Sequence, residues 1–157
     1  MKEQEQWIDH VIQLAIENVR SGRGGPFASL VVRDGAILAE GTNVVTSTND
    51  PCAHAEIVAI RRACQKLGRF ELRGCEIYSS CEPCPMCLGA IYWARLAPLY
   101  FAAGKEDAAK AGFDDSFIYQ EFSRPLDQRK IPMVRVTNRK ALDAFRAWEQ
   151  QPNKVPY

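Results

Sequence analysis

Two short segments, far apart in the sequence, constrain the fold of this chain more than any other feature. The first is His54-Ala55-Glu56, and the second is Pro83-Cys84-Pro85-Met86-Cys87. Each segment opens a predicted helix, and Cys84 and Cys87 share one helix face because residues three apart are neighbours there. A helix N-terminus also stabilises the negative charge of a thiolate. We therefore expect the two segments to meet and to form one site.

His54, Cys84 and Cys87 together supply three ligands for a zinc ion. A structural zinc site normally has four protein ligands, whereas a catalytic site keeps one position open for water. His54 and Glu56 are two positions apart, so in a regular helix their side chains would point in different directions. With the metal above the first turn, His54 binds it and Glu56 reaches the bound water. We expect one zinc ion and an activated water per subunit, with Glu56 as a proton shuttle rather than a ligand.

Cys81 adds a second, overlapping C-x-x-C pair to the motif. The prolines on either side of Cys84 suit the first turn of a helix that begins there, which leaves Cys81 at the end of the preceding strand. A closed structural site that includes Cys81 stays the alternative, and Glu56 is then an ordinary first-turn carboxylate. The remaining cysteines are predicted to be buried packing residues, and they are Cys52, Cys64 and Cys75.

The order of the predicted elements indicates the fold class. Apolar residues at helical spacing predict a helix over residues 7–19, and an Asp-Gly turn joins two strands into a hairpin. Strands and helices then alternate. The predicted strands are 27–32, 36–39, 75–79, 98–102 and 133–137, and the predicted helices after the first are 51–67, 86–95, 108–111, 116–122 and 142–148. A hairpin followed by βαβ units predicts a mixed five-stranded sheet with helices on both faces, a three-layer α/β/α domain over residues 1–157.

Charge and hydropathy exclude several classes of partner. The chain of 157 residues has 20 Lys and Arg against 19 Asp and Glu, a net charge of +1. No basic field is available for nucleic acid or an anionic membrane, so we expect a small, neutral substrate instead. No stretch approaches the roughly 18 apolar residues of a membrane span, and the N-terminal segment lacks the apolar region of a signal peptide. These features predict a cytoplasmic protein with reduced thiols.

Four stretches extend the metal motif into a family resemblance over nearly the whole chain. H-x-E together with P-C-x-x-C is a known signature of zinc-dependent nucleobase deaminases. The stretches are GGPF at 24–27, TSTNDPCAHAE at 46–56, SCEPCPMCLGAIYWAR at 80–95 and AGFDDSFIY at 111–119. With them the chain resembles the cytidine deaminase-like superfamily and, within it, the bacterial guanine deaminases. The resemblance implies the cytidine deaminase-like fold and the zinc-dependent hydrolysis of guanine to xanthine and ammonia, a step of purine catabolism and salvage.

The resemblance also implies a set of substrate contacts. They are Phe27, Asn43, Ala55, Trp93, Asp114 and Asp115. Asn43 would hydrogen-bond the purine, and Phe27 and Trp93 would lie near it. The alternatives are a turn position for Asn43 and packing in the core for the two aromatic residues. Ala55 would offer a backbone N–H at a helix start. Of the two acids, we expect Asp115 to accept from guanine and Asp114 to cap the next helix, with their assignment left open.

The C-terminus gains a role only through the resemblance. From composition alone, its last residues are a frayed tail. In similar guanine deaminases, the C-terminal segment crosses to the partner of a homodimer, and the terminal Tyr closes the pocket of the other subunit. The resemblance implies such an exchange for about residues 138–157, with Tyr157 in the partner's pocket.

The metal motif does not select the base that is deaminated. Attack at C2 of guanine, C6 of adenine and C4 of cytosine use the same centre, so guanosine deaminase and tRNA adenosine deaminase stay open as alternatives, as does a non-enzymatic module stabilised by zinc. A tRNA substrate favours a basic C-terminal helix. The C-terminal cations are offset by acids instead: the cations are Arg139, Lys140 and Arg146, and the acids are Asp143 and Glu149.

Overall fold

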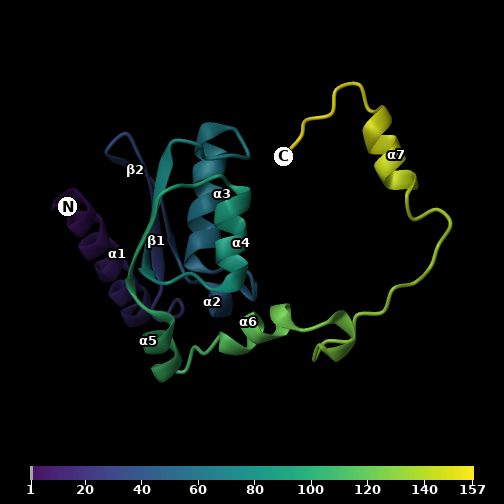
Figure 1. The fold of residues 1–157 in the computed structure, drawn as a ribbon. Coiled ribbons are helices and arrows are strands. Elements are labelled where there is room, and N and C mark those ends of the chain that lie inside the picture. Colours follow the sequence, from purple (N-terminus) through teal and green to yellow (C-terminus); the bar gives the residue numbers. More distant parts are fainter. Residues whose placement is uncertain (1) are drawn as a thin grey trace. The chain divides into compact units, whose positions relative to one another are not determined.

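A mixed sheet of four strands forms the centre of the first part of the chain (Figure 1). The structure is a computed structural model that describes residues 2–157. The strands are β1 (Ala28–Arg33), β2 (Ala36–Thr42), β3 (Cys75–Cys81) and β4 (Leu99–Ala103), in the order β2-β1-β3-β4. Strand β1 is antiparallel to both β2 and β3, and β3 is parallel to β4. Strands β2, β3 and β4 therefore run in one direction, and β1 runs against them.

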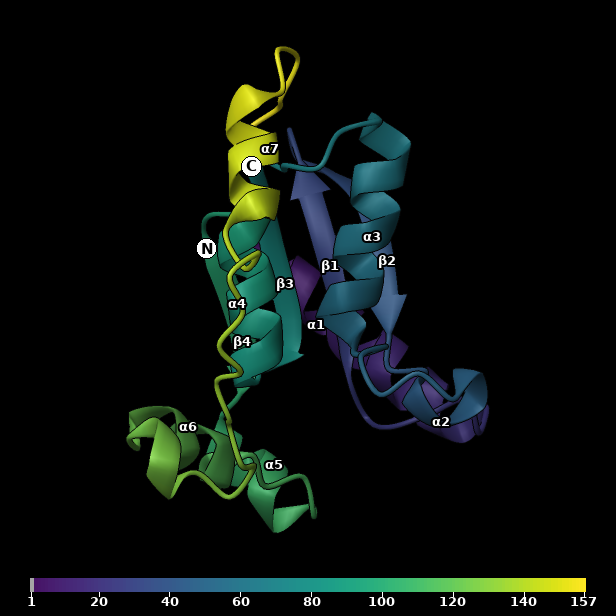
Figure 2. The same cartoon turned by 90° about the vertical axis from the view of Figure 1, so that its right-hand side faces the viewer.

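Helices cover both faces of this sheet, which confirms the predicted three layers (Figures 1 and 2). Helix α1 (Lys2–Arg20) lies on one face, and α3 (Ala55–Leu67) and α4 (Pro85–Trp93) lie on the other. Strand β1 serves both layers because successive side chains point to opposite faces. Leu30 and Val32 pack in the cluster under α1, whereas Val31 packs in the cluster under α3 and α4.

Local signals in the sequence set the ends of these elements as predicted. Asp34 and Gly35 have φ of 51° and 70°, the left-handed conformation that a two-residue hairpin turn requires. Gly68, with φ of 61°, ends α3, and its N–H donates to the carbonyls of Cys64 and Gln65. Further helices are α2 (Val45–Thr48), α5 (Lys105–Lys110), α6 (Ser116–Ser123) and α7 (Asp143–Gln150), with a 3₁₀ turn at Leu126–Gln128.

The prediction of a fifth strand over residues 133–137 is wrong. These residues have no regular secondary structure, and Val134 and Val136 are 82% and 81% exposed. Strand propensity reflects packing against neighbouring strands, so alternation of β-branched residues cannot make a strand without a partner edge. The short helix α2 lies between β2 and α3, where no helix was predicted.

The chain divides into two compact units, one that ends at Ser116 and one at Phe117–Tyr157. The second unit consists of most of α6, the 3₁₀ turn and α7, joined by irregular chain. In it, the carboxylate of Glu121 accepts from Arg124 at 2.9 Å and from the N–H of Lys130 at 2.5 Å. Within residues 2–157, no helix combines the length and the apolar character that a membrane crossing requires.

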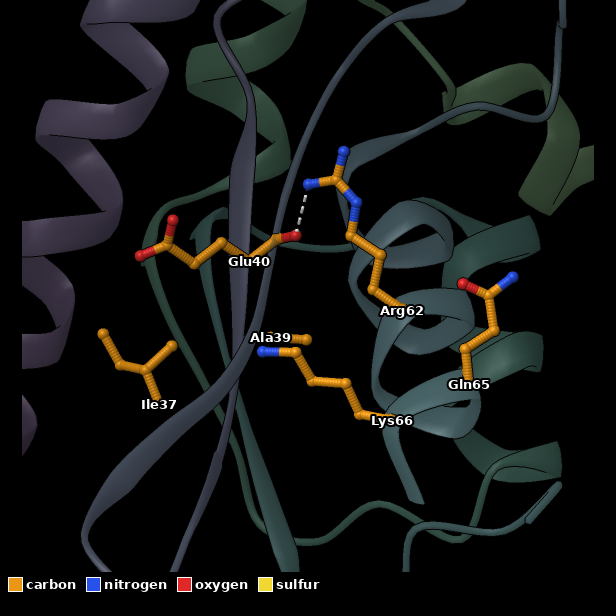
Figure 3. Close-up of a pocket in the computed structure, with 6 residues that line it drawn as sticks. All are labelled: Ile37, Ala39, Glu40, Arg62, Gln65 and Lys66. Atoms are coloured by element: carbon orange, nitrogen blue, oxygen red, sulfur yellow. Dashed lines mark hydrogen bonds between the residues drawn. The ribbon is translucent and has the colours of Figure 1, made fainter. Parts of the chain in front are cut away.

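The outer edge of β2 is covered by two cationic side chains of α3 (Figure 3). Arg62 donates to the carbonyl of Glu40 at 2.9 Å, and Lys66 donates to the carbonyl of Leu38 at 2.7 Å. A hollow of about 560 Å³ lies between these side chains and the strand. Cations on an edge strand discourage the addition of another strand, so the sheet is protected at this end.

Candidate metal centre and active site

Most of the predicted site residues lie in segments that adjoin one end of the sheet. Strands β2, β3 and β4 run in the same direction, so their carboxyl ends lie at the same end of the sheet, where β1 begins. The last residues of these strands are Thr42, Cys81 and Ala103. Ligands of open α/β sheets bind outside the carboxyl ends of the strands. The loop before β1 and the loops after β2, β3 and β4 therefore lie together at this end of the sheet.

Two helix starts present the three predicted zinc ligands. His54 is the N-cap of α3 and Cys84 is the N-cap of α4, and both have extended backbones, with ψ of 157° and 166°. Neither side chain caps its own helix, so both are available to a ligand. Cys87 follows in the first turn of α4. The donor atoms of the three residues lie within 4.8 Å of one another, and Cys84 Sγ is 3.6 Å from His54 Nδ1.

This donor set fits a zinc ion. Zinc binds imidazole nitrogen and thiolate sulfur at about 2.0–2.3 Å in tetrahedral geometry, which separates two donors by about 3.3–3.8 Å. The distance of 3.6 Å between the Cys84 and His54 donors is in this range. Cys81 is not in the donor group, because its Sγ lies 3.6 Å from the carbonyl oxygen of Gly104. Three protein donors leave a fourth position open, as in catalytic zinc sites.

The charges of the donors prepare the site for a cation. The hydrogen bond from Cys87 and the contact with His54 lower the pKa of the Cys84 thiol to about 4. The same contact with Cys84 raises the pKa of His54, and the hydrogen bond to Cys84 raises the pKa of Cys87. Without metal, the site therefore contains the Cys84 thiolate next to His54 and Cys87, whose raised pKa values favour bound protons. A metal ion would displace these protons.

Glu56 lies in the first turn of α3 and is 7% exposed. Burial raises the pKa of its carboxyl group, and a hydrogen bond from Cys87 opposes that shift. It is not among the grouped donors. A carboxyl group with a raised pKa next to a metal site suits proton transfer near neutral pH.

Asn43 follows directly after β2 and is held through its backbone and its side chain. Its N–H donates to the carbonyl of Phe27 at 3.0 Å, and its Oδ1 accepts from the N–H of Val45 at 3.3 Å. The residue is 8% exposed. Asn43 and Phe27 are thereby joined next to the end of the sheet that carries the metal donors.

The loop after α5 brings further predicted residues to this edge. Phe27 packs edge-to-face on Phe113, with ring centroids 4.9 Å apart. Asp114 accepts from the N–H of Ser116, the first residue of α6, at 2.9 Å, which is the kind of contact expected of a capping residue. Asp115 is half-buried, and burial together with the negative charge of Cys84 raises its pKa. Asp115 is therefore the acid whose electrostatic environment includes the metal site.

Three other predicted residues have different positions. Ala55 is fully buried at the first residue of α3, where the backbone N–H lacks an intrahelical partner. Trp93 is the last residue of α4, about 9 Å along the helix from Cys87, and is 64% exposed. Tyr157 ends the second unit and is 75% exposed. Roles for Trp93 and Tyr157 in the pocket stay predictions.

The sequence reading missed two residues at this edge, Asn18 and Phe113. Asn18 is fully buried, and its Nδ2 donates to the carbonyls of Gly25 and Asn43. It lies on the apolar stripe of α1 with Val11 and Ala15, at helical spacing. A single amide on an otherwise apolar face was the signal that could have identified it.

Comparison with known families agrees with this geometry. Residues 1–103 match the cytidine and deoxycytidylate deaminase zinc-binding region. The chain belongs to this family. The matched residues contain the sheet, α1, α3 and α4, and therefore all three grouped metal donors.

Members of the family differ in how much of the chain they match. The guanine deaminase of Bacillus subtilis (strain 168) is 54% identical over 153 residues, which is 98% of both chains. A solved structure of guanine deaminase from Bacillus subtilis superposes with a TM-score of 0.96 at 54% identity over 98% of both chains. A tRNA-specific adenosine deaminase of Agrobacterium fabrum is 40% identical over 60% of this chain and 64% of its own. Similarity to the guanine deaminase thus includes the second unit, beyond the shared metal-binding region.

A further solved structure is a complex with 2,6-diaminopurine. It is 37% identical, with a TM-score of 0.69, and the match covers 71% of this chain and 62% of that chain. The ligand of that relative is a purine base.

Proposed function

We propose that this protein hydrolyses guanine to xanthine and ammonia with one zinc ion per subunit. The observation that carries the proposal is the open group of three metal donors beside a buried carboxyl group that is not a ligand. The reaction class follows from this geometry, and the choice of guanine is supported by the similarity over the full length to a guanine deaminase.

The metal and Glu56 divide the chemistry. His54, Cys84 and Cys87 would hold the zinc ion, which would supply a water of lowered pKa as a nucleophile at neutral pH. The Glu56 carboxylate accepts a proton from the attacking water and gives it to a ring nitrogen of guanine. When the tetrahedral centre at C2 collapses, Glu56 accepts the second proton from the new hydroxyl group on C2 and transfers it to the departing amine, which leaves as ammonia. The raised pKa of Glu56 allows one group to accept and return these protons.

The surrounding residues hold the base. The side chain of Asn43 hydrogen-bonds the purine, and the rings of Phe27 and Phe113 form an apolar wall beside it. Backbone N–H groups at the start of α3, near Ala55, are donors for the substrate. Asp115 accepts from guanine N–H groups. Trp93 and, from the partner subunit, the exchanged C-terminal segment with Tyr157 complete the pocket in a homodimer.

The thiols are consistent with action in the cytoplasm. All six cysteines are free in the structure. Zinc thiolates and free cysteines persist in a reducing compartment. We place the enzyme there, with a purine base rather than nucleic acid as its substrate.

A panel of substrates tests the proposal. We expect release of equal amounts of ammonia and xanthine from guanine, loss of this activity with a chelator, and its recovery with zinc. Guanosine, adenine, cytosine and tRNA should release no ammonia under the same conditions. Deamination of adenosine in tRNA without activity on guanine would overturn the proposal, and zinc binding without activity on any substrate would indicate a binding module.

A further inference from the structure

We infer that Asn18 is a positioning residue, which holds the purine-binding side of the site from the opposite layer of the fold. The inference rests on the proposed function. Asn18 lies in α1 and is fully buried, and its Nδ2 donates to the carbonyl of Gly25 at 2.9 Å and to the carbonyl of Asn43 at 2.8 Å. One amide group therefore ties together the loop before β1 and the residue after β2.

Both carbonyls belong to segments that present groups to the base. The carbonyl of Gly25 also accepts from the N–H of Phe27 at 2.9 Å, so the Asn18 contact fixes the turn that orients Phe27. The carbonyl of Asn43 lies so close to Gly24 that a Cβ there would be 2.1 Å from the oxygen. The two segments can approach only because residue 24 is glycine, and Asn18 fixes them at this separation.

The other half of the Asn18 amide has no hydrogen-bond partner, so the side chain acts through its Nδ2. Within residues 2–157, Asn18 Oδ1 is one of two buried side-chain oxygen or nitrogen atoms without a hydrogen-bond partner. Burying an unpaired acceptor is unfavourable, and a leucine of similar volume would avoid it. The two bonds from Nδ2 are the reason that an amide suits this position.

Asn18 has no hydrogen bond to the metal donors. Its side chain forms hydrogen bonds with the carbonyls of Gly25 and Asn43. Its removal should therefore weaken binding of the base while the metal stays bound. Loss of an interaction that holds substrate and transition state equally raises KM with little change in kcat.

The test compares Asn18→Leu with Val11→Ala, a control on the same helix. Val11 is fully buried in the cluster under α1, and the members of this cluster do not include residues of either loop. For Asn18→Leu we expect a KM for guanine raised roughly three- to tenfold, because two hydrogen bonds are lost, with kcat within about twofold and one zinc per subunit. Val11→Ala should lower the Tm through its cavity and leave KM unchanged.

A second measurement is independent of activity. In zinc-loaded Asn18→Leu, hydrogen exchange should accelerate at the amides of Phe27, Asn43 and Val45, and not in β3. If exchange at these amides and KM both match wild type, or if Val11→Ala raises KM equally, the inference is wrong. If wild type does not deaminate guanine, the proposed function fails, and the exchange experiment alone decides the role of Asn18.

Discussion

His54 and Glu56 are two positions apart, and backbone conformation gives them different tasks. His54 is an N-cap with an extended backbone, so its ring lies beyond the N-terminal end of α3, next to Cys84. Glu56 is already within the helix and is buried. A regular helix through both residues would separate their side chains, whereas the helix boundary between them suits the proposed roles, in which one binds metal and the other moves protons.

Replacement of Glu56 by Gln tests this division. Glu56→Gln keeps the size of the side chain and removes the exchangeable proton, so we expect turnover of guanine to fall by about 10²–10⁴. Zinc content, measured by atomic absorption, should stay at one per subunit. Glu5→Gln, an exposed carboxylate on α1, is the matched control and should retain full activity. Full activity of Glu56→Gln would remove the proton shuttle from the mechanism.

Single cysteine substitutions distinguish the open site from a closed one. Cys81→Ala should retain zinc and most activity, because the Sγ of Cys81 faces the Gly104 carbonyl rather than the donor group. Cys87→Ala should lose zinc, because one of three donors is removed. Zinc titration after chelation measures both. Loss of zinc from Cys81→Ala would support the structural site with four ligands.

At the level of elements, the site depends on how closely α3 lies on the sheet. Gly41 in β2 faces the first turns of this helix, and a Cβ at residue 41 would be 2.2 Å from the carbonyl oxygen of Ala55 and 2.5 Å from the nitrogen of Ala59. Both neighbours are backbone atoms and cannot move without the helix. The positions of His54 and Glu56 at the start of α3 therefore depend on the lack of a Cβ at Gly41.

The substitution Gly41→Ala should displace the start of α3. We expect a loss of about 3 kcal/mol or more in the free energy of unfolding, at the upper end of overpacking effects, together with weaker zinc binding. Gly89→Ala in α4 is the control, because a Cβ at residue 89 would contact no atom within 4 Å. It should stabilise the fold by about 0.5–1 kcal/mol, since glycine is unfavourable inside a helix. Urea unfolding of both variants provides the comparison, and equal stability of the two would contradict the packing argument.

At the level of the whole molecule, the second unit exposes an unusual amount of apolar surface. Its exposed apolar side chains are Phe117, Phe122, Leu126, Ile131, Met133, Val134, Val136, Leu142, Phe145, Trp148, Val155 and Tyr157. Large exposed apolar side chains in this number suit a segment that packs against another chain. This exposure supports the proposed homodimer with exchanged C-terminal segments.

Mixed dimers test the exchange directly. Deletion of residues 153–157 should lower turnover and leave the zinc content unchanged. Co-expression of this deletion with full-length Glu56→Gln should restore up to one active site per mixed dimer, because the intact tail of one subunit would serve the Glu56 of the other. Activity that does not exceed that of the separate variants, or a deletion variant with unchanged dimerisation and turnover, would show that each chain closes its own pocket.

Short-range patterns in the sequence determined much of this protein. The Asp34-Gly35 turn, the stop at Gly68 and the Cys84-x-x-Cys87 pair rest on the conformation of a few adjacent residues. These elements and the two cysteines of the donor group therefore followed from short-range spacing. The contact between the Asp114 side chain and the N–H of Ser116 is likewise local, because the two residues are two positions apart.

Only the tertiary structure decided the remaining features, because they depend on distances between residues that are remote in sequence. The predicted strand at 133–137 is absent because a strand needs a partner edge, which a sequence pattern does not supply. The contact of Asn18 with Asn43 and the approach of Gly41 to Ala55 exist only after α1, β2 and α3 have packed. The sequence therefore identified the side chains that could hold a metal ion, and packing between layers decided how the residues proposed to bind the base are held beside them.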